Sequence, residues 1–270
     1  MHAAGCIEAG FARFCKRGAQ VLESKAVSKP VRMNSETASA NTAQPSILSD
    51  TDLFKNIDRN TLGSIEQSCR YRRFSAQEQI IDKDSAAADV FFIVRGRARV
   101  VNYSISGREI TFADLAEGEY FGELSAIDGL PQSAAVMAVE DCLVLSLPRR
   151  LFLAMLADYP ETALKVMQRL AKMVRVANER IMDLSTLAAH NRVQAELLRQ
   201  AQSHGTIRNA AVIQPIPIHS DIASRVSTTR ETVARVLNDL ARKGIVERTR
   251  NALLIRNVHL LHAMVQEVRG

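Results

Sequence analysis

The sequence predicts an α+β chain with three structural parts: an N-terminal antiparallel β jelly roll, one long helix suited to dimerisation, and a C-terminal winged helix-turn-helix. Three patterns predict this fold. Short stretches of β-branched and aromatic residues recur between Leu48 and Leu147. An apolar repeat of about 3.5 residues then runs from Pro160 to Ala188. Near the C-terminus, two short amphipathic segments precede a hairpin pattern.

These patterns divide the 270 residues into four segments, and a hydrophobic content of 47% is ample for two buried cores. Ser, Thr, Ala and Asn dominate from Asn34 to Pro45, which predicts a flexible tail. One hypothesis is that Met33 is the true start and that residues 1–32 are upstream sequence. The predicted segments are the tail (1–47), a β-barrel domain (48–158), a coiled-coil helix (159–188) and a winged-helix domain (189–270).

Seven strands are predicted in the barrel domain, after two capped helical turns at Asp50–Ile57 and Asp58–Cys69. Turns of Gly, Asp, Ser or Asn separate the strands. The predicted strands are Tyr71–Phe74, Glu78–Asp82, Val90–Val94, Ala98–Tyr103, Glu109–Leu115, Ala134–Val139 and Cys142–Leu147. Many short strands at near-regular spacing indicate a jelly roll or barrel. Such folds hold small ligands or bind partners, so the fold alone names no function.

One barrel segment, Phe121–Val136, carries chemistry. Its Gly-Glu-Leu begins a short helix after a strand, and small residues lead back into the next strand. A helix N-terminus and small residues leave backbone N–H groups free to point at a phosphate. Glu123 could accept a hydrogen bond from a sugar hydroxyl. The alternative is a tight structural turn whose glycines only solve a backbone problem, and the segment by itself leaves both open.

The long helix carries an apolar seam at alternating spacings of four and three residues. Charged residues such as Lys172 and Arg180 lie off this seam. The period favours a coiled coil with a second copy of the chain, although a helix packed on its own barrel would also show an apolar stripe. The predicted dimerisation residues are Met167, Leu170, Val174, Ala177, Ile181 and Leu184.

The stretch Asp221–Leu240 predicts a helix-turn-helix. Its first segment has an apolar face, Ser-Thr-Thr supplies side-chain oxygens for a helix N-terminus, and a second amphipathic segment follows. This geometry places the start of a helix in a DNA major groove. The pattern alone also fits an ordinary antiparallel helical hairpin. However, Gly244–Arg256 reads as two strands around a polar turn at Thr249–Asn251, so the whole predicts a winged helix that binds DNA.

The distribution of charge supports that placement. From Ala189 to the C-terminus there are twelve Lys and Arg against six Asp and Glu, which accounts for the whole formal charge of +6. A basic surface on a helix-turn-helix is the electrostatic footprint expected for binding phosphates.

Several classes of protein are disfavoured by the sequence. No run of 18 apolar residues exists, so we expect no membrane span, and residues 1–20 do not read as a signal peptide. The four cysteines lie far apart without a CxxC pair, which favours free thiols in a reduced, cytoplasmic protein. His259 and His262 lack a third ligand nearby, so no metal site is predicted. There is no nucleophile–base pair and no P-loop, so we expect no enzyme activity.

Barrel, cradle, coiled-coil helix and winged helix in this order resemble the CRP/FNR family of bacterial transcription regulators, over about residues 48–257. The most specific matches are Phe121-Gly-Glu-Leu, Pro131-x-Ser-Ala-x-Val136 and Ser227–Leu237. The resemblance implies a homodimer that binds a palindromic operator and acts with RNA polymerase.

The resemblance also implies which residues contact DNA. Arg230, Glu231 and Arg235 fall on positions that read base edges, as Arg can pair with guanine and Glu can accept from cytosine. Thr229 and Thr232 suit phosphate contacts. The full predicted set is Thr228, Thr229, Arg230, Glu231, Thr232, Arg235 and the wing residue Arg250.

The implied effector is a cyclic nucleotide, cAMP or cGMP, but one position departs from the family pattern. Where cyclic-nucleotide-binding members carry an Arg against the cyclic phosphate, this chain has Gln132. Losing such a charge-assisted bond costs roughly 1.5–3 kcal/mol. The family's base-recognising Thr-Ser pair falls on Ala177-Asn178. The predicted effector-binding residues are Gly122, Glu123, Leu124, Gln132, Ser133, Ala134, Ala177 and Asn178.

Other readings differ in the effector. An iron–sulfur cluster is disfavoured because Cys6 and Cys15 have no third ligand nearby, and no histidine lies between residues 48 and 189 to hold a haem. The main alternative is an effector-independent regulator of the same family. A less favoured alternative is a cyclic-nucleotide-binding module that regulates a partner protein.

Overall fold

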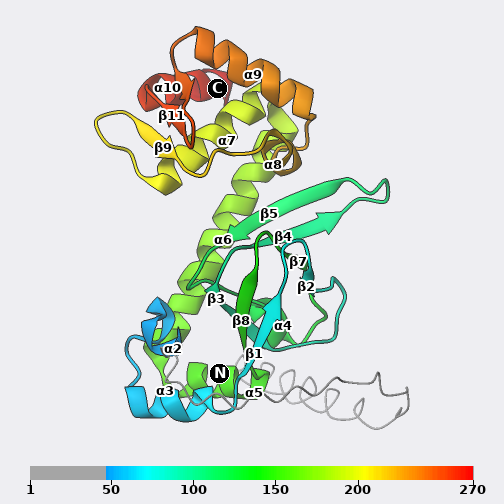
Figure 1. The fold of residues 1–270 in the computed structure, drawn as a ribbon, viewed down its shortest axis with the longest axis vertical. Helices are drawn as coiled ribbons and strands as arrows, with labels where there is room; N and C mark the ends of the chain where they lie inside the picture. The colour runs from blue at the N-terminus through cyan, green and yellow to red at the C-terminus, as the bar shows by residue number, and fades with distance from the viewer. Residues whose placement is uncertain (1–46, 270) are drawn as a thin grey trace, which may run out of the picture. The chain divides into compact units, whose positions relative to one another are not determined.

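Two antiparallel sheets of four strands each form the jelly roll within residues 47–269, the part of the chain that the computed structural model describes. Their strand orders, β1-β8-β3-β6 and β2-β7-β4-β5, confirm the predicted fold (Figure 1). The strands are β1 (Arg70–Phe74), β2 (Gln79–Ile81), β3 (Val90–Arg95), β4 (Ala98–Tyr103), β5 (Glu109–Leu115), β6 (Tyr120–Phe121), β7 (Ala135–Ala138) and β8 (Cys142–Leu147). The sequence pattern misses β6 because two residues show no period.

Apolar side chains of the two sheets meet in a core between them. Phe91 of β3 and Phe121 of β6 stack with their ring centroids 5.3 Å apart. Ala98 of β4 and Val136 of β7 are buried in the same cluster. This packing holds β6, and hence the segment that follows it, against the barrel.

Short helices cover the N-terminal end of the barrel. They are α2 (Ile47–Asp50), the 3-10 helix η1 (Asp52–Phe54) and α3 (Arg59–Glu66). The Asp58 carboxylate caps α3 by accepting a hydrogen bond of 3.0 Å from the backbone N–H of Thr61. Phe54 packs on Phe92 of β3 with a centroid separation of 5.5 Å. The two predicted helical turns are therefore present, the first as a 3-10 helix.

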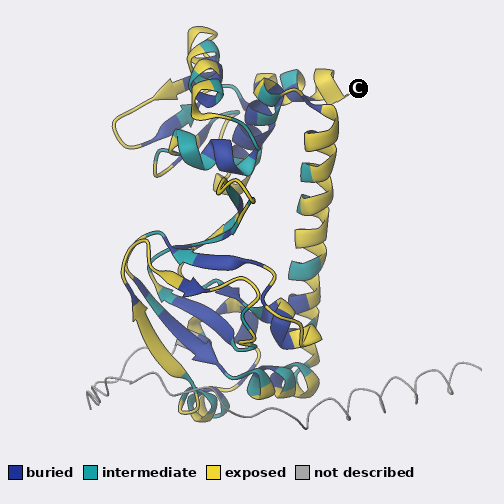
Figure 2. Ribbon diagram, turned by 90° about the vertical axis from the view of Figure 1, so that its right-hand side faces the viewer, coloured by how far each residue is buried: buried dark blue, intermediate teal, exposed yellow. Residues whose placement is uncertain are grey.

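The connector between the domains is α5 (Arg149–Asp158) followed by α6 (Pro160–Thr186). Proline suits the first position of a helix because the N–H it lacks would have no partner there. Near its start α6 packs on the barrel, where Thr162 and Val166 are buried. Beyond Leu170 most of the helix is exposed (Figure 2). The long helix is confirmed to within two residues of its predicted end.

The C-terminal domain combines four helices with a three-stranded sheet among the described residues. They are α7 (Ala189–His204), β9 (Ala211–Ile213), α8 (His219–Arg225), α9 (Arg230–Arg242), β10 (Val246–Arg248), β11 (Leu253–Ile255) and α10 (Val258–Arg269). The sheet order β10-β11-β9 confirms the wing hairpin and adds β9, which the sequence pattern misses. The predicted turn at Thr249–Asn251 is present, since the Thr249 N–H donates to the Ala252 carbonyl over 2.9 Å and the Ala252 N–H donates to the Thr249 hydroxyl over 3.1 Å.

The turn between α8 and α9 is tight. Ser227 adopts a left-handed backbone with φ of 50°, and the N–H of Thr228 donates to the carbonyl of Ala223 over 3.0 Å. Thr229 then caps α9, its hydroxyl accepting from the N–H of Thr232 over 3.3 Å. The Ser-Thr-Thr segment therefore closes the first helix and starts the second, as predicted for a helix-turn-helix.

The remaining expectations concern the termini, the thiols and the membrane. The predicted tail (residues 1–47) and the Met33 hypothesis concern residues outside the described part of the chain. The exception is Ile47, the last residue of the predicted tail, which belongs to α2. Cys69 and Cys142 are free thiols, and burial raises the pKa of Cys69 to about 12. Within residues 47–269 no helix is long and apolar enough to span a membrane, and no group of three or more His, Cys, Asp or Glu side chains could hold a metal ion.

Candidate effector cradle and DNA interface

The predicted cradle lies where β6 ends and α4 (Glu123–Asp128) begins. Gly122 precedes the helix with φ of 86° and Gly129 follows it with φ of 74°, both in the left-handed region that glycine tolerates. The chain therefore turns sharply at each end of α4. The turn at Gly122 directs Glu123 inward, and Glu123 is only 4% exposed.

Glu123 is a buried carboxyl group in an unusual setting. Burial raises its pKa, while the nearby positive charge of Arg169 and a hydrogen bond from its own backbone N–H act in the opposite direction. A buried carboxylate needs hydrogen-bond donors. A ligand hydroxyl is one group that would meet this need.

Arg169 of α6 is a residue that the sequence reading missed. Its guanidinium lies 4.1 Å from the ring centroid of Tyr120, and its Nη2 donates to the Tyr120 carbonyl over 2.6 Å. Its Nε is buried and has no hydrogen-bond partner among the described residues. Arg169 therefore brings the long helix into electrostatic contact with the buried Glu123. No local pattern could identify it, because it lies 46 positions after Glu123.

Gln132 has a bracing role in the cradle. Its side chain is buried, and its Nε2 donates to the carbonyl of Ala87 over 2.8 Å. Its backbone N–H donates to Ser85 and its carbonyl accepts from Asp84, each over 2.9 Å. Gln132 therefore ties the loop before β3 to the segment that returns to β7. An arginine at this position would present a cation, whereas the amide here is already bonded within the protein.

The other predicted effector residues are placed less uniformly. Ser133 and Leu124 are exposed and Ala134 is buried, all within the same segment. Ala177 and Asn178 are exposed on α6, eight and nine residues beyond Arg169. At about 1.5 Å per residue this is roughly 12–14 Å along the helix axis. Their contact with a nucleotide base remains a prediction.

The recognition helix α9 has one buried face and one free face. Val233, Val236 and Leu240 are buried in the core of the domain. The predicted base-reading residues Arg230, Glu231 and Arg235 are exposed, as is Thr229 before them, whereas Thr228 and Thr232 are half-buried. Hydrogen bonds from its own backbone N–H and from Thr229 lower the pKa of Glu231, which favours the charged form. Arg250 is exposed at the tip of the wing.

The long helix α6 presents an apolar stripe to solvent. Met167, Val174 and Ile181 are 57–59% exposed and Leu184 is 47% exposed, although all are large apolar side chains. Ala177 is also exposed on this helix. Leu170 differs, since it is half-buried and packs partly on the barrel core of its own chain. The use of these residues in a dimer seam remains a prediction.

Two models of known protein families match the segments that contain the cradle and the helix-turn-helix. The model of the cyclic nucleotide-binding domain matches residues 71–159, which include the cradle. The model of the Crp-like helix-turn-helix domain matches residues 191–264, which include α8, α9 and the wing.

Several relatives align with more than half of this chain. The chain is 34% identical over 173 residues to the cyclic AMP receptor protein of Thermus thermophilus, covering 64% of this chain and 77% of that protein. It is 24% identical over 210 residues to a CRP-like cAMP-activated global transcriptional regulator of Mycobacterium tuberculosis, covering 77% and 94%. A solved structure of a CooA mutant from Carboxydothermus hydrogenoformans has the same fold, with a TM-score of 0.69 at 24% identity, over 81% of this chain and 97% of that one.

The relative from Mycobacterium tuberculosis is described as a transcriptional regulator. Both domain models match in the order that the structure shows, and one relative exceeds 30% identity over most of its length. The chain therefore belongs to the CRP/FNR family of transcription regulators.

Proposed function

We propose that this regulator binds a palindromic operator as a homodimer and that a cyclic nucleotide in the cradle controls this binding. The observation that carries the proposal is the exposed polar face of α9, which presents Arg230, Glu231 and Arg235, together with the exposed basic wing residue Arg250. Side chains of these types can read base edges in the major groove.

The exposed stripe on α6 supports the homodimer. A soluble chain rarely leaves a row of large apolar side chains in water, and the spacing of this row matches a coiled-coil seam. A two-fold axis along α6 would present two recognition helices to half-sites about one turn of DNA apart.

The cradle fits a cyclic nucleotide in part. Glu123 would accept a hydrogen bond from the ribose hydroxyl, and the backbone N–H groups of Ser133 and Ala134 would face the phosphate. The relatives from Thermus thermophilus and Mycobacterium tuberculosis are described as a cyclic AMP receptor and a cAMP-activated regulator. Gln132 supplies only a neutral amide, so we expect weaker binding than an arginine there would give.

A regulator that works without an effector is the second candidate. The observation that favours it is the bond from Gln132 to the Ala87 carbonyl, which braces the cradle by protein contacts alone. In either case we propose RNA polymerase as the partner through which the bound regulator acts, and the cytoplasm as its location.

Calorimetric titration with cAMP and cGMP separates the two candidates. We expect the wild type to bind one nucleotide at micromolar concentration, Glu123→Gln to lose that binding, and Gln132→Arg to strengthen it about tenfold or more. Failure of both the wild type and Gln132→Arg to bind would favour the effector-independent regulator. Selection of duplexes from a random DNA library by the wild type tests sequence-specific binding separately.

A further inference from the structure

A cavity outside the cradle lies between the start of α6, the 3-10 helix η1 and the turn that joins β5 to β6. Its volume is about 510 Å³, which is within the range of small-molecule sites. Residues from all three elements line it, among them Leu53, Gly118 and Arg169. Neither Gly122 nor Gln132 of the cradle lines this cavity. The cavity is therefore a separate space on the same domain.

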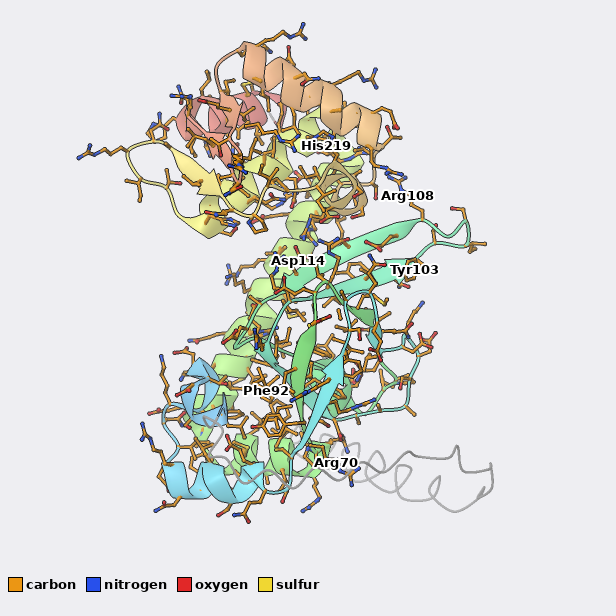
Figure 3. All side chains as sticks on the ribbon, in the orientation of Figure 1. Arg70, Phe92, Tyr103, Arg108, Asp114 and His219 are labelled. Carbon is orange, nitrogen blue, oxygen red and sulfur yellow. The ribbon has the colours of Figure 1, made fainter. Side chains whose placement is uncertain are left out.

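The packed core of the barrel forms the base of the cavity. Tyr120 of β6 lines the cavity and is only 6% exposed. The ring centroid of Phe92 lies 5.5 Å from that of Tyr120 and 5.5 Å from that of Phe54. Phe92 also shares a buried cluster with Val166 of α6, and Figure 3 shows Phe92 where the barrel meets this helix. Because the base is buried and apolar, the polar walls decide what the cavity can bind.

Three cations of α6, Lys165, Arg169 and Lys172, form a basic wall of the cavity. They recur at spacings of four and three residues, so they share one face of the helix. At about 1.5 Å per residue, the basic wall extends along roughly 10 Å of the helix axis. Met167 and Val174 of the predicted seam lie on the opposite face, at about 100° per residue. A dimer formed through that seam would therefore leave the basic wall open.

The carboxylates beside the basic wall do not neutralise it. None of its three side chains forms a salt bridge within residues 47–269. Asp52 lines the cavity but pairs with Lys55 over 2.7 Å, and the contacts of Lys55, followed by the charge of Lys165, lower the pKa of Asp52. Glu119 also lines the cavity, and its carboxylate accepts from the N–H of Ala116 over 2.7 Å. The wall therefore keeps an excess of positive charge.

Several donors of the basic wall have no acceptor in the described part of the chain. Arg169 gives one bond of 2.6 Å to the Tyr120 carbonyl, whereas its Nε is buried without a partner there. Lys165 donates to the backbone carbonyl of Asp52, and Lys172 makes no hydrogen bond within residues 47–269. Buried donors without a partner are rare in folded proteins. An anion in the cavity would supply acceptors to a guanidinium that the protein satisfies only in part.

We propose that this cavity binds a small polyanion with two or more linked phosphate groups, at a site separate from the cradle. A single phosphate would meet only part of a wall that extends roughly 10 Å, whereas linked phosphates match its length. Arg169 can pair with phosphate oxygens through two parallel bonds, and the two lysines add point charges. Arg169 is also in electrostatic contact with Glu123, so the test leaves Arg169 unchanged. The inference is independent of the proposed binding of cyclic nucleotide and DNA.

Calorimetric titration of the full chain with inorganic phosphate, pyrophosphate and triphosphate tests the proposal. We expect pyrophosphate to bind at least tenfold more tightly than phosphate, and the double variant Lys165→Gln with Lys172→Gln to weaken pyrophosphate binding at least tenfold. Arg175→Gln is the matched control, because Arg175 is exposed on the same helix and does not line the cavity. It should change the affinity by less than about twofold.

A second variant serves if the double variant does not fold. Gln168 is exposed and lines the cavity, so Gln168→Glu adds a carboxylate beside the basic wall and should also weaken pyrophosphate binding. Equal weakening by Arg175→Gln and the double variant would overturn the inference, since general attraction to a basic helix would explain it. An affinity that does not rise with the number of phosphates, or no binding at millimolar concentration, would also overturn it.

Competition separates this site from the cradle. Pyrophosphate should remain bound in the presence of cAMP or cGMP, and Glu123→Gln, which we expect to lose nucleotide binding, should still bind pyrophosphate. Displacement of pyrophosphate by either cyclic nucleotide would place the anion in the cradle and would overturn the inference. A wild type that binds pyrophosphate but no cyclic nucleotide would count against the proposed effector and leave the second site in place.

Discussion

The backbone of Gly122 passes so close to Asp89 that a Cβ atom at Gly122 would lie 2.7 Å from the Asp89 carbonyl oxygen. The same atom would lie 3.3 Å from the ring of Phe91, and φ of Gly122 is already 86°. The loop before β3 and the start of α4 therefore cross at a distance that only glycine allows. This crossing sets the direction in which Glu123 enters the cradle.

Gly122→Ala should therefore destabilise the barrel. The new methyl group must push against backbone and hold a left-handed conformation, which costs about 1–3 kcal/mol or more. We expect a lower midpoint in urea unfolding and, in the folded fraction, weaker binding of nucleotide.

Gly63→Ala is the matched control for this change. Gly63 lies inside α3, and a Cβ there would meet nothing within 4 Å. Alanine in a helix interior is favoured over glycine by about 1 kcal/mol, so this variant should be more stable than the wild type. If the two variants shift the midpoint in the same direction, the tight crossing at Gly122 is not a determinant of stability.

The buried carboxyl of Glu123 should make stability depend on pH. Because its pKa is raised in the folded state, the ionised group is disfavoured there relative to the unfolded chain, and this cost is complete above the folded pKa. Glu123→Gln should therefore unfold at a higher temperature than the wild type at neutral pH. This difference in unfolding temperature should disappear as the pH falls through the folded-state pKa of Glu123 towards the ordinary pKa of a glutamate.

Thermal unfolding at several pH values measures that gap. Glu140→Gln serves as a control for the change in net charge, since Glu140 is an exposed carboxylate of the same barrel. A constant gap across the pH range, or a less stable Glu123→Gln at neutral pH, would contradict the assignment of a buried, disfavoured charge.

The sequence predicted those features whose signals are local. The Ser-Thr-Thr cap before α9, the period of α6 and the short helix that begins at Gly-Glu-Leu each depend on neighbours a few residues away, and each is present in the structure. The Gln132 departure was also visible in the sequence. Its bond to Ala87 was not, because the two residues are 45 positions apart.

The features that were missed depend on distant parts of the chain. Arg169 meets Tyr120 only because α6 folds back on the barrel. The strand β9 is three residues long and becomes recognisable only beside β11. The contact of Thr111 with Ser224 requires both domains to be folded. Such contacts are decided by tertiary packing, for which a single sequence carries no periodic signal.

A charge in the predicted seam of α6 should prevent dimerisation. Ile181 belongs to the predicted seam, and Ile181→Asp would place two unpaired carboxylates at the proposed dimer interface. We expect the dimer to dissociate at concentrations on the order of a hundredfold higher than for the wild type. Met182→Asp is the control, since Met182 is 60% exposed against 59% for Ile181 but lies off the seam.

Sedimentation velocity across a concentration series measures both variants. Equal dissociation of Ile181→Asp and Met182→Asp would show that a general apolar surface, rather than the seam, holds the copies together. A wild type that is monomeric at all concentrations would remove the dimer from the proposed function.

Truncation of single arginine side chains on the recognition helix should distinguish the reading of base edges from general electrostatic attraction to DNA. Arg230→Ala or Arg235→Ala removes a side chain that we expect to pair with guanine, and the loss should cost about 1–3 kcal/mol on the selected duplex and much less on an unrelated one. Arg242→Ala removes the same charge from the far end of α9, where the side chain is 79% exposed beside Asp239. Because the start of the helix enters the groove, Arg242→Ala should preserve the preference for the selected sequence.

Fluorescence anisotropy on both duplexes between about 50 and 200 mM salt measures the sequence preference and the salt dependence of binding together. If all three variants lose affinity equally on both duplexes, these arginines act only on the phosphate backbone, and sequence must be read by other residues.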